Sequence, residues 1–420
     1  MIQINKKALV LIYGLFCIFN NLSAQVIVES GSIFNKVSNF ISGIPRSTGD
    51  DYILPTNAEI NNWNNIITDL INADFVPAAS TANSLGYDLI EFSDTTTSLH
   101  QIYYILSPNS SNHWGFYIFN PNYCRSLVIQ SPHPKYDFNT GKEGVYVFKE
   151  TKALFFCLSG THRCNSSQFS SCSGSTTACS SNSENFRLSD LAHNDNSIFQ
   201  KTTKVLFNTF DDSYFIQLHG FSRDPGEPYL ILSNGTQQTP NDDYLVDFRN
   251  AILIEDGTLT AVVAHVDLAW TSLRGFSNTQ GRLINQSANF CNSNAISTNG
   301  RFFHIEQEKT KLRNDITGWT KVSNALRNTF ICQPLSIENN VLHRNVLTIY
   351  PNPTSDKFII ESIEIEPEEI NVLSVLGRNV NSNVEITRLS DTKILLDVSK
   401  LPAGFYVIKS EKTANKVYKQ

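Results

Sequence analysis

A histidine and an aspartate stand four residues apart, just past an apolar run, in the stretch LVIQSPHPKYDFNT at residues 127–140. The run stops at Ser131, and His133 and Asp137 follow it. If the chain turns helically after His133, with Pro134 at the first position of the turn, both side chains lie on one side. Zinc accepts imidazole nitrogen and carboxylate oxygen, and a catalytic zinc site keeps one position for water. The spacing therefore predicts two metal ligands; a surface turn with a solvated aspartate is the alternative.

A further histidine ends another apolar segment. In YFIQLHGFS, at residues 214–222, His219 precedes Gly220. An imidazole at the end of a buried strand needs a polar partner or a pocket. Glycine at the next position permits the close approach of backbone or ligand. His219 is therefore a candidate metal ligand, and a structural histidine is the alternative.

The stretch RFFHIEQE, at residues 301–308, adds a carboxylate of the right kind for proton transfer. His304 and Glu306 are two residues apart and so lie on the same face of a strand. A carboxylate beside an open metal position can act as a general base. Glu306 is the candidate base, and an ion pair with Arg301 or Arg313 is the alternative.

An arginine emerges at a fourth strand end, in LSGTHRCNS at residues 158–166. His162 and Arg163 directly follow an apolar run. The guanidinium of Arg163 offers paired donors for a carboxylate or an oxyanion. A salt bridge within the loop is the alternative reading of Arg163.

The order of these motifs resembles the zinc carboxypeptidase-like superfamily, which includes relatives of N-formylglutamate and succinylglutamate amidohydrolases. The resemblance covers roughly residues 100–315 and implies a Zn²⁺ cofactor, with substrates that contain a peptide or amide bond. Carried over to this sequence, it implies a site whose members are metal ligands His133, Asp137 and His219, catalytic residues Glu306 and Arg163, and substrate-binding residues Arg163 and Asn165.

The sequence departs from that family at the second ligand. The family usually has a glutamate three residues after the first histidine, whereas Asp137 stands four residues after His133. His162 or His304 could take the place of Asp137, and the sequence leaves this choice open. Asn165 is matched to the family only through its place beside Arg163.

The elements that must position these residues alternate between strand-like and helix-like segments. The strand-like runs are QIYYIL (101–106), LVIQ (127–130), GVYVF (144–148), ALFFCLSG (153–160), YFIQLHGF (214–221), PYLILSNG (228–235), TAVVAHVDL (260–268) and RFFHIEQE (301–308). The helix candidates are residues 57–75, 188–210 with Ser189 and Asp190 as capping residues, and 242–255. This alternation predicts an α/β fold with a mixed, largely parallel sheet flanked by helices, as in carboxypeptidase-like proteins. Ligands of such sheets bind at the carboxyl ends of strands, where the candidate residues lie.

Four segments are expected along the chain. Residues 1–24 are typical of an export signal, because Lys6 and Lys7 precede an apolar stretch and small residues follow it. Residues 25–335 form the α/β domain, 336–345 a linker, and 346–420 a small all-β sandwich of short alternating strands. No later stretch is long and apolar enough to cross a membrane.

The C-terminal segment carries four motifs in a characteristic order. They are YPNPTSDKF (350–358), LSVLGRNV (373–380), LPAGFYVIK (401–409) and KVYKQ (416–420). They resemble the type A C-terminal sorting domain of the type IX secretion system of Bacteroidota. The resemblance implies that residues 346–420 engage the type IX secretion machinery. The mature protein is then expected to be secreted or held at the outer-membrane cell surface.

Charge and cysteine usage fit an exported protein. The formal net charge is −6 and no basic run is long, which argues against a nucleic-acid partner. Of eight cysteines, Cys17 lies in the export signal and seven remain. Disulfides are the default for them outside the cytosol, with at least one thiol unpaired and the connectivity open. A cysteine-ligated zinc is disfavoured because the sequence has no CxxC pair.

Together these features predict a secreted or cell-surface zinc-dependent hydrolase of amide or peptide bonds. The alternative is a non-enzymatic adhesion or binding protein with a disulfide-stapled loop and exposed aromatic residues such as Trp114 and Tyr117. A serine esterase is disfavoured because GxSxG is absent. The substrate, endo- or exo-cleavage and the oligomeric state stay open.

Overall fold

The computed structural model describes residues 25–96, 100–332, 348–361, 367–374, 378–390, 392–409 and 414–420. The chain divides into two compact units, Met1–Pro334 and Leu335–Gln420. The expected export signal (1–24) and the expected linker (336–345) lie outside the described residues.

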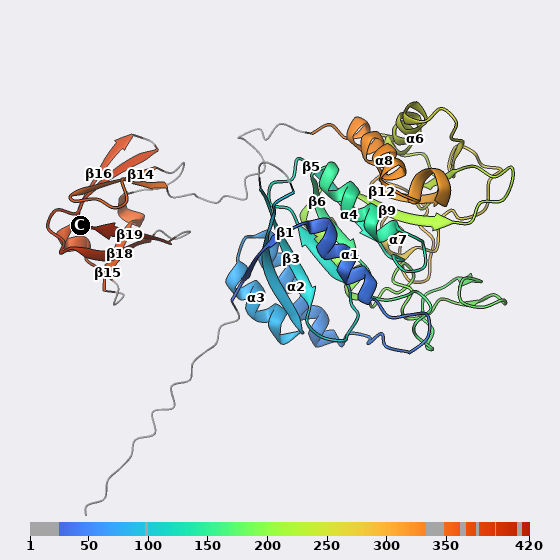
Figure 1. Cartoon of the computed structure of the whole chain (residues 1–420), viewed down its shortest axis with the longest axis horizontal. Coiled ribbons are helices and arrows are strands. Elements are labelled where there is room, and N and C mark those ends of the chain that lie inside the picture. Colours follow the sequence, from blue (N-terminus) through green and yellow to red (C-terminus); the bar gives the residue numbers. More distant parts are fainter. Residues whose placement is uncertain are drawn as a thin grey trace, which may run out of the picture. The chain divides into compact units, whose positions relative to one another are not determined.

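A ten-stranded sheet forms the centre of the first unit, in the order β1-β2-β3-β4-β6-β5-β9-β12-β10-β11. Six of its strands, β1, β3, β5, β6, β9 and β12, are labelled in Figure 1. Its strands are β1 (Ile27–Gly31), β2 (Tyr87–Asp94), β3 (Gln101–Pro108), β4 (Phe116–Phe119), β5 (Arg125–Ser131), β6 (Ala153–Leu158), β9 (Tyr214–Phe221), β10 (Leu230–Ser233), β11 (Ala261–Val263) and β12 (Phe302–Glu308). Five of its nine pairings are parallel, which confirms the mixed, largely parallel sheet. The four neighbours β6, β5, β9 and β12 all run in the same direction, so their carboxyl ends meet at one edge.

Helices cover both faces of this sheet. They are α1 (Ile33–Gly43), α2 (Asn57–Ile71), α3 (Phe75–Ser84), α4 (Thr140–Glu150), α5 (Ile198–Thr209), α6 (Tyr244–Glu255), α7 (Thr279–Ile284) and α8 (Ile316–Thr329). Apolar residues of α1, α4, α6 and α8 join one face of the strands in a large core cluster. On the other face, Trp63 of α2 packs on Tyr87 and Tyr117, and Thr203 of α5 accepts a hydrogen bond from Gln130 of β5. Both faces are therefore buried, as the apolar strands predict.

Two of the expected elements take another form. The run GVYVF (144–148) lies in α4 and not in a strand, with Val145 and Phe148 on the core side. Gly144 lets this helix approach the sheet, because a Cβ there would collide with Ser131 and Phe156. The helix expected at 188–210 begins only at Ile198, after Ser197 as its N-cap.

The other helix predictions hold with small changes. Residues 57–75 contain α2, whose N-terminus is stabilised by a capping box between Thr56 and Glu59. A second helix, α3, begins at Phe75. Residues 242–255 contain α6. Trp114 and Tyr117 are each 0% exposed, so they cannot serve the adhesive surface considered above.

Three disulfides join Cys124 to Cys332, Cys164 to Cys179 and Cys172 to Cys291. Cys157, in β6, is a buried free thiol. The expectation of disulfides with one odd cysteine is thus confirmed for the part of the chain that the structure describes.

The second unit is all-β, as expected. Its antiparallel sheets have the orders β13-β14-β17-β16 and β15-β18-β19. The strands are β13 (Thr348–Tyr350), β14 (Lys357–Glu361), β15 (Asn371–Ser374), β16 (Glu385–Ser390), β17 (Lys393–Asp397), β18 (Gly404–Lys409) and β19 (Ala414–Lys419). Both sheets contribute to one hydrophobic cluster that includes Phe358, Leu396, Val372 and Ile408, which is the packing of a small sandwich. Within the described ranges of the whole chain, no helix has both the length and the apolar character to cross a membrane.

Candidate metal centre and catalytic site

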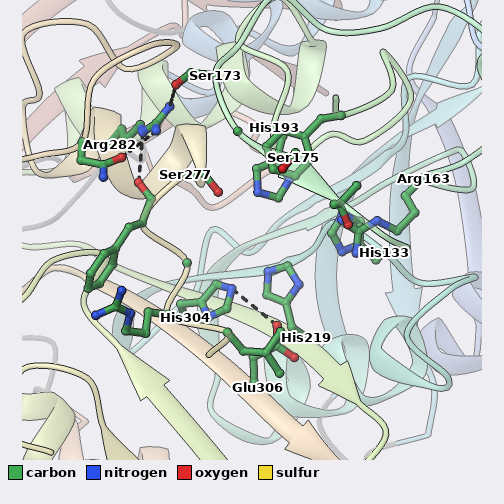
Figure 2. A pocket seen from close by; sticks show the side chains of 18 of the residues that line it. His133, Arg163, Ser173, Ser175, His193, His219, Ser277, Arg282, His304 and Glu306 are labelled. Carbon is green, nitrogen blue, oxygen red and sulfur yellow. Dashed lines mark hydrogen bonds and ion pairs between the residues drawn. The ribbon is translucent and has the colours of Figure 1, made fainter. Parts of the chain in front are cut away.

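Four adjacent parallel strands deliver polar side chains to one edge of the sheet. His133 follows β5, Arg163 follows β6, His219 lies on β9 and Glu306 lies on β12. His219 and Glu306 are register partners on neighbouring strands. Residues far apart in sequence therefore line one cavity of about 720 Å³ (Figure 2).

His133, Asp137 and His219 converge on one point. Asp137 donates its backbone N–H to the carbonyl of His133 at 2.8 Å, so the chain makes the helical turn that the sequence predicts after β5. Asp137 Oδ2 lies 3.4 Å from His133 Nδ1 and 3.4 Å from His219 Nδ1. All three side chains are buried, and the structure brings these three sequence-predicted residues together.

Hydrogen bonds on the far side of each imidazole determine which nitrogen carries the proton. His219 Nε2 lies 2.7 Å from Gln217 Oε1, and a carbonyl oxygen only accepts, so this nitrogen is the donor. His133 Nε2 lies 2.8 Å from Asp190 Oδ1 in the same way. With Nε2 taken by these partners, Nδ1 of each imidazole faces Asp137. This is the arrangement of metal-binding histidines that are held by carbonyl or carboxylate partners.

Two atoms of this group have no hydrogen-bond partner among the described residues. They are His133 Nδ1 and Asp137 Oδ2, both buried. Leaving a buried polar atom unpaired costs about 1–3 kcal/mol, so such atoms call for an explanation. A divalent cation that accepts both lone pairs supplies one, and two nitrogens with one carboxylate oxygen are ligands that zinc takes. The residues present thus fit the metal that the sequence predicts.

The charges around Asp137 keep it ionised. Burial opposes ionisation, but the nearby imidazoles of His133 and His219 outweigh it and hold the pKa of Asp137 well below its ordinary value. Burial lowers the pKa of His219 to about 4, which favours its neutral form. An ionised carboxylate beside a neutral imidazole is the protonation state that a metal requires of its ligands.

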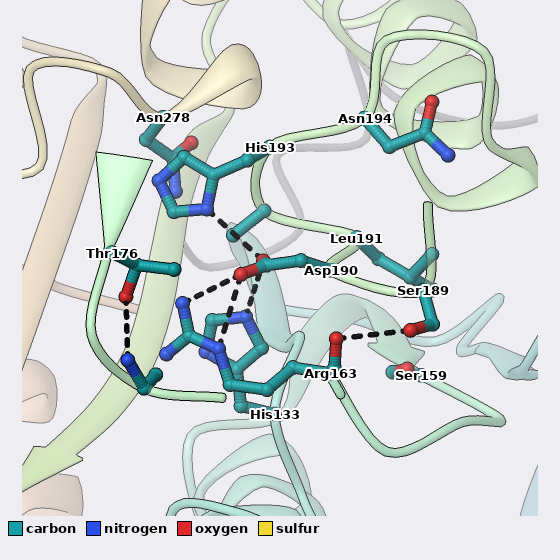
Figure 3. A network of polar contacts seen from close by, with 12 residues as sticks. His133, Ser159, Arg163, Thr176, Ser189, Asp190, Leu191, His193, Asn194 and Asn278 are labelled. Carbon is teal, nitrogen blue, oxygen red and sulfur yellow. Dashed lines mark hydrogen bonds and ion pairs between the residues drawn. The ribbon is translucent and has the colours of Figure 1, made fainter. Parts of the chain in front are cut away.

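Asp190 contacts the candidate ligand His133 and two further residues, Arg163 and His193 (Figure 3). Besides His133, it accepts hydrogen bonds from Arg163 Nη2 at 2.6 Å and Nε at 3.0 Å, and it lies 3.0 Å from His193 Nδ1. Burial works against its charge, but Arg163 and the two histidines hold the pKa of Asp190 well below its ordinary value. Asp190 was expected to cap a helix; instead it fixes His133 and Arg163. The segment before α5 is irregular, so the apolar pattern of the sequence gave no signal of this role.

Glu306 is buried beside the candidate ligands. Its Oε1 lies 3.8 Å from His304 Nε2, and its Oε2 has no hydrogen-bond partner in the described part of the chain. Burial, together with the charge of Asp137, raises the pKa of Glu306 to about 8. The expected alternative, an ion pair with Arg301 or Arg313, is absent among the described residues. Both arginines donate to backbone carbonyls, those of Ser213 and Gln307 among them. A carboxyl with this pKa can exchange protons near neutral pH.

The alternative ligands and the predicted substrate residue lie in different places. The ring centroid of His304 lies 4.4 Å from that of His219. Together with His219 and Glu306, His304 forms another set of side chains that could hold a metal ion. His162 accepts a hydrogen bond from the Cys164 amide and packs against Tyr136. Among the described residues, it belongs to none of the clusters that could hold a metal ion.

Asn165 is not brought to the site. Its side chain accepts from the amides of Asp51 and Tyr52 and donates to the carbonyl of Arg46. It lines neither the cavity of Figure 2 nor a second cavity, of about 700 Å³, that Asp137 lines. The neighbouring Arg163 does line both of them, so adjacency in sequence was a poor guide for Asn165.

Sequence reasoning also missed Gln217. It lies two residues before His219 and therefore on the same face of β9, where it is fully buried. Gln217 Nε2 donates to Gln130 and Gln280, and this leaves its carbonyl oxygen for His219. A glutamine inside an apolar strand, in step with the histidine, was the signal that could have revealed it.

Comparisons with known proteins inform the two units differently. An endo-acting ulvan lyase from Formosa agariphila is 24% identical over 216 residues, which are 51% of this chain and 34% of the relative. The chain thus spans about a third of the length of that protein. A solved structure from Shewanella denitrificans, assigned as a metallopeptidase, aligns with 65% of this chain and 92% of its own at 15% identity. Its TM-score is 0.28, and a superposition of that quality establishes no shared fold.

The C-terminal unit gives the firm assignment. The family model described as the secretion system C-terminal sorting domain matches residues 348–420. This match agrees with the four motifs and with the small antiparallel sheets of that unit. The chain therefore ends in a type IX secretion C-terminal sorting domain, which directs it to the cell surface or to the medium.

Proposed function

We propose that the first unit is a zinc-dependent hydrolase of amide or peptide bonds that acts outside the cell. The observation that carries the proposal is the convergence of His133 Nδ1, His219 Nδ1 and Asp137 Oδ2, with two of these atoms buried and unpartnered. Glu306 lies in the same cavity, where its carboxyl can serve as a general base. A bound zinc would lower the pKa of a water molecule to roughly 7 and polarise a carbonyl.

The residues of this chain would divide the remaining work. Glu306 would accept the proton of the attacking water and pass it to the leaving nitrogen, because its carboxylate lines the cavity beside the candidate ligands. Arg163 would donate hydrogen bonds to the developing oxyanion or to a substrate carboxylate. Asp190 already holds Arg163 through Nε and Nη2, so the guanidinium is oriented before the substrate arrives.

The test is the substitution Glu306→Gln, which keeps the size of the side chain and removes the proton acceptor. Hydrolysis of a fluorogenic peptide library by the zinc-loaded protein should fall by about 10²–10⁴-fold, while the zinc content stays unchanged. Glu150→Gln, at the end of α4 and outside the cavity, is the matched control and should retain activity. Equal rates of hydrolysis by wild type and Glu306→Gln would contradict the assignment of Glu306 as the general base.

A non-enzymatic binding protein makes the opposite prediction. His133→Ala and His219→Ala would then leave ligand binding intact, and the wild-type protein would hydrolyse nothing in the library. Under our proposal, each of these two variants loses hydrolysis together with zinc.

A further inference from the structure

The candidate site lies where two large cavities meet. The first, of about 720 Å³, and a second, of about 700 Å³, share Arg163, Thr176, Leu273 and Glu306 in their walls. Each cavity by itself has the size that commonly accommodates a small ligand. The proposed base and the proposed oxyanion donor therefore each border both cavities.

The first cavity is polar and cationic. Its wall includes Ser277, Arg274, Arg282 and two serines, Ser173 and Ser175, of the stapled loop, which is the segment 164–179 closed by the Cys164–Cys179 disulfide. Glu306, at the junction, is the sole carboxylate residue among the described residues of this wall. A cavity with this balance favours a negatively charged group.

The two arginines of this wall differ in how they are held. The guanidinium of Arg282 donates to the carbonyls of Phe276 and Cys291 and to Asn294, so it ties the disulfide-linked loop to α7. For Arg274, the described contact is with the ring of Phe276, whose centroid lies 4.5 Å from Cζ. Within the described ranges no carboxylate pairs with Arg274. It is therefore the arginine with donors to offer a ligand.

The second cavity adds exposed aromatic rings to charged side chains such as Arg223 and Glu308. Tyr136 and Phe138 line it and are 42% and 47% exposed, and Phe221 contributes a third aromatic ring. Lys309 Nζ lies 4.4 Å from the centroid of the Phe138 ring. Exposed aromatic rings beside a reactive site are suited to packing against an apolar or aromatic part of a ligand.

We infer that the site cleaves an internal amide bond of an extended peptide chain, with an acidic residue in the first cavity against Arg274 and an apolar or aromatic residue on Tyr136 and Phe138. This inference rests on the proposed function and adds to it the mode of cleavage and the class of substrate. A free terminus is not required, because the chain can continue into a cavity on either side.

The first experiment uses internally quenched peptides whose two ends are blocked by acetyl and amide groups. The zinc-loaded protein should cleave a blocked peptide that carries Asp or Glu on one side of the bond and Phe on the other. Arg274→Gln should lower kcat/KM for this peptide by about 10-fold or more, the worth of one charge-assisted hydrogen bond. For a peptide with Asn and Gln in place of Asp and Glu, the same Arg274→Gln substitution should change kcat/KM by less than about 3-fold. Arg249→Gln, on α6 and outside both cavities, is the matched control.

The second experiment measures binding without turnover. Fluorescence anisotropy of a labelled, blocked acidic peptide is followed with Glu306→Gln and with the double variant Glu306→Gln/Arg274→Gln. The double variant should bind the peptide about 10-fold more weakly. Equal binding by the two proteins would overturn the role of Arg274.

The remaining outcomes separate this inference from the proposed function. Cleavage confined to peptides with a free terminus would overturn the internal mode and leave the hydrolase standing. No cleavage of any peptide by the zinc-loaded protein would overturn the hydrolase, and the inference with it. Binding of polygalacturonate but of no peptide would replace the peptide with an acidic polysaccharide.

Discussion

At the scale of single residues, the site depends on the partners behind the candidate ligands. Asp190 and Gln217 determine which nitrogen of His133 and of His219 carries hydrogen, and so they direct two lone pairs at Asp137. An imidazole free to rotate or to change tautomer would present the wrong atom for part of the time. The affinity for a cation is thus expected to depend on residues that do not touch it.

Replacing Asp190 by Asn tests this dependence. The variant loses the negative charge that orients His133 and Arg163, so the affinity for Zn²⁺ should fall by about 10–100-fold. Competition with a fluorescent chelator measures the affinity, and circular dichroism checks the fold. Asp224→Asn, on an exposed loop, is the matched control. An unchanged affinity of Asp190→Asn would show that His133 needs no such partner.

Glu143 of α4 gives a pH prediction away from the candidate ligands. Burial raises the pKa of this carboxyl to about 8 from an ordinary value of 4.5, and Gln307 Nε2 donates to its Oε2. Between these two pH values the unfolded chain has lost the proton while the folded chain keeps it. Stability therefore falls as pH rises through this window, and the full penalty remains above pH 8.

Glu143→Gln should remove that penalty. We expect unfolding free energies close to wild type at pH 5 and higher than wild type at pH 9, by roughly 1–3 kcal/mol. Urea denaturation at the two pH values measures both, and Glu150→Gln on the same helix controls for the loss of a carboxylate. A variant that is less stable than wild type at pH 9 would contradict the prediction.

The sequence predicted the residues at strand ends better than those in loops. The sequence could place His133, His219 and Glu306 in one cavity because apolar alternation locates a strand and its end, and parallel strands share an edge. His193 and Asp190 come from an irregular segment whose path depends on packing with α5 and the stapled loop. The sequence does not tell which way adjacent loop side chains point. It therefore could not show that Arg163 faces the cavity while Asn165 does not.

At the scale of elements, two disulfides hold the loop that forms one wall of the first cavity. Cys172 pairs with Cys291 at a separation of 119 residues, and Cys164 pairs with Cys179 at 15. Cross-linking distant positions restricts the unfolded chain more than cross-linking near ones. The Cys172–Cys291 disulfide should therefore contribute more to the free energy of unfolding than the Cys164–Cys179 disulfide.

The double variant Cys172→Ser/Cys291→Ser should lose about 2–4 kcal/mol of unfolding free energy. Cys164→Ser/Cys179→Ser is the matched comparison and should lose less. Urea unfolding of both variants, without reductant, measures the order. A larger loss of unfolding free energy for Cys164→Ser/Cys179→Ser would contradict the view that these disulfides stabilise the fold by restricting the unfolded chain.

The errors in the predicted elements have a common cause. GVYVF is rich in β-branched and aromatic residues, which favour strands, yet it forms part of α4 because tertiary packing on the sheet decides. In the segment 188–210, capping residues occur at both Ser189 and Ser197, and the helix uses the second. Local preference alone could not choose between them.

At the scale of the whole molecule, the two units have separate hydrophobic cores. The C-terminal motifs were predictable from sequence because their order and spacing are specific, and the match to residues 348–420 agrees with them. The chemistry of the first unit was harder to predict because four distant segments create it.

Removal of residues 348–420 should leave the first unit folded and misdirect it. In a bacterium with a type IX system, the truncated protein should accumulate in the periplasm, whereas the full chain reaches the surface or the medium. Cell fractionation with immunoblotting distinguishes these fates. Export of the truncated protein in the same proportion as the full chain would contradict the assignment of the tail as the sorting signal.

The central claim is that His133, Asp137 and His219 hold one divalent cation. The most direct measurement is elemental analysis of the purified, dialysed protein beside His133→Ala/His219→Ala, with His100→Ala, an exposed histidine, as the control. The account predicts about one zinc per chain in wild type and in the control, and almost none in the double variant. Equal zinc in all three proteins, or none in wild type after zinc loading, would contradict it.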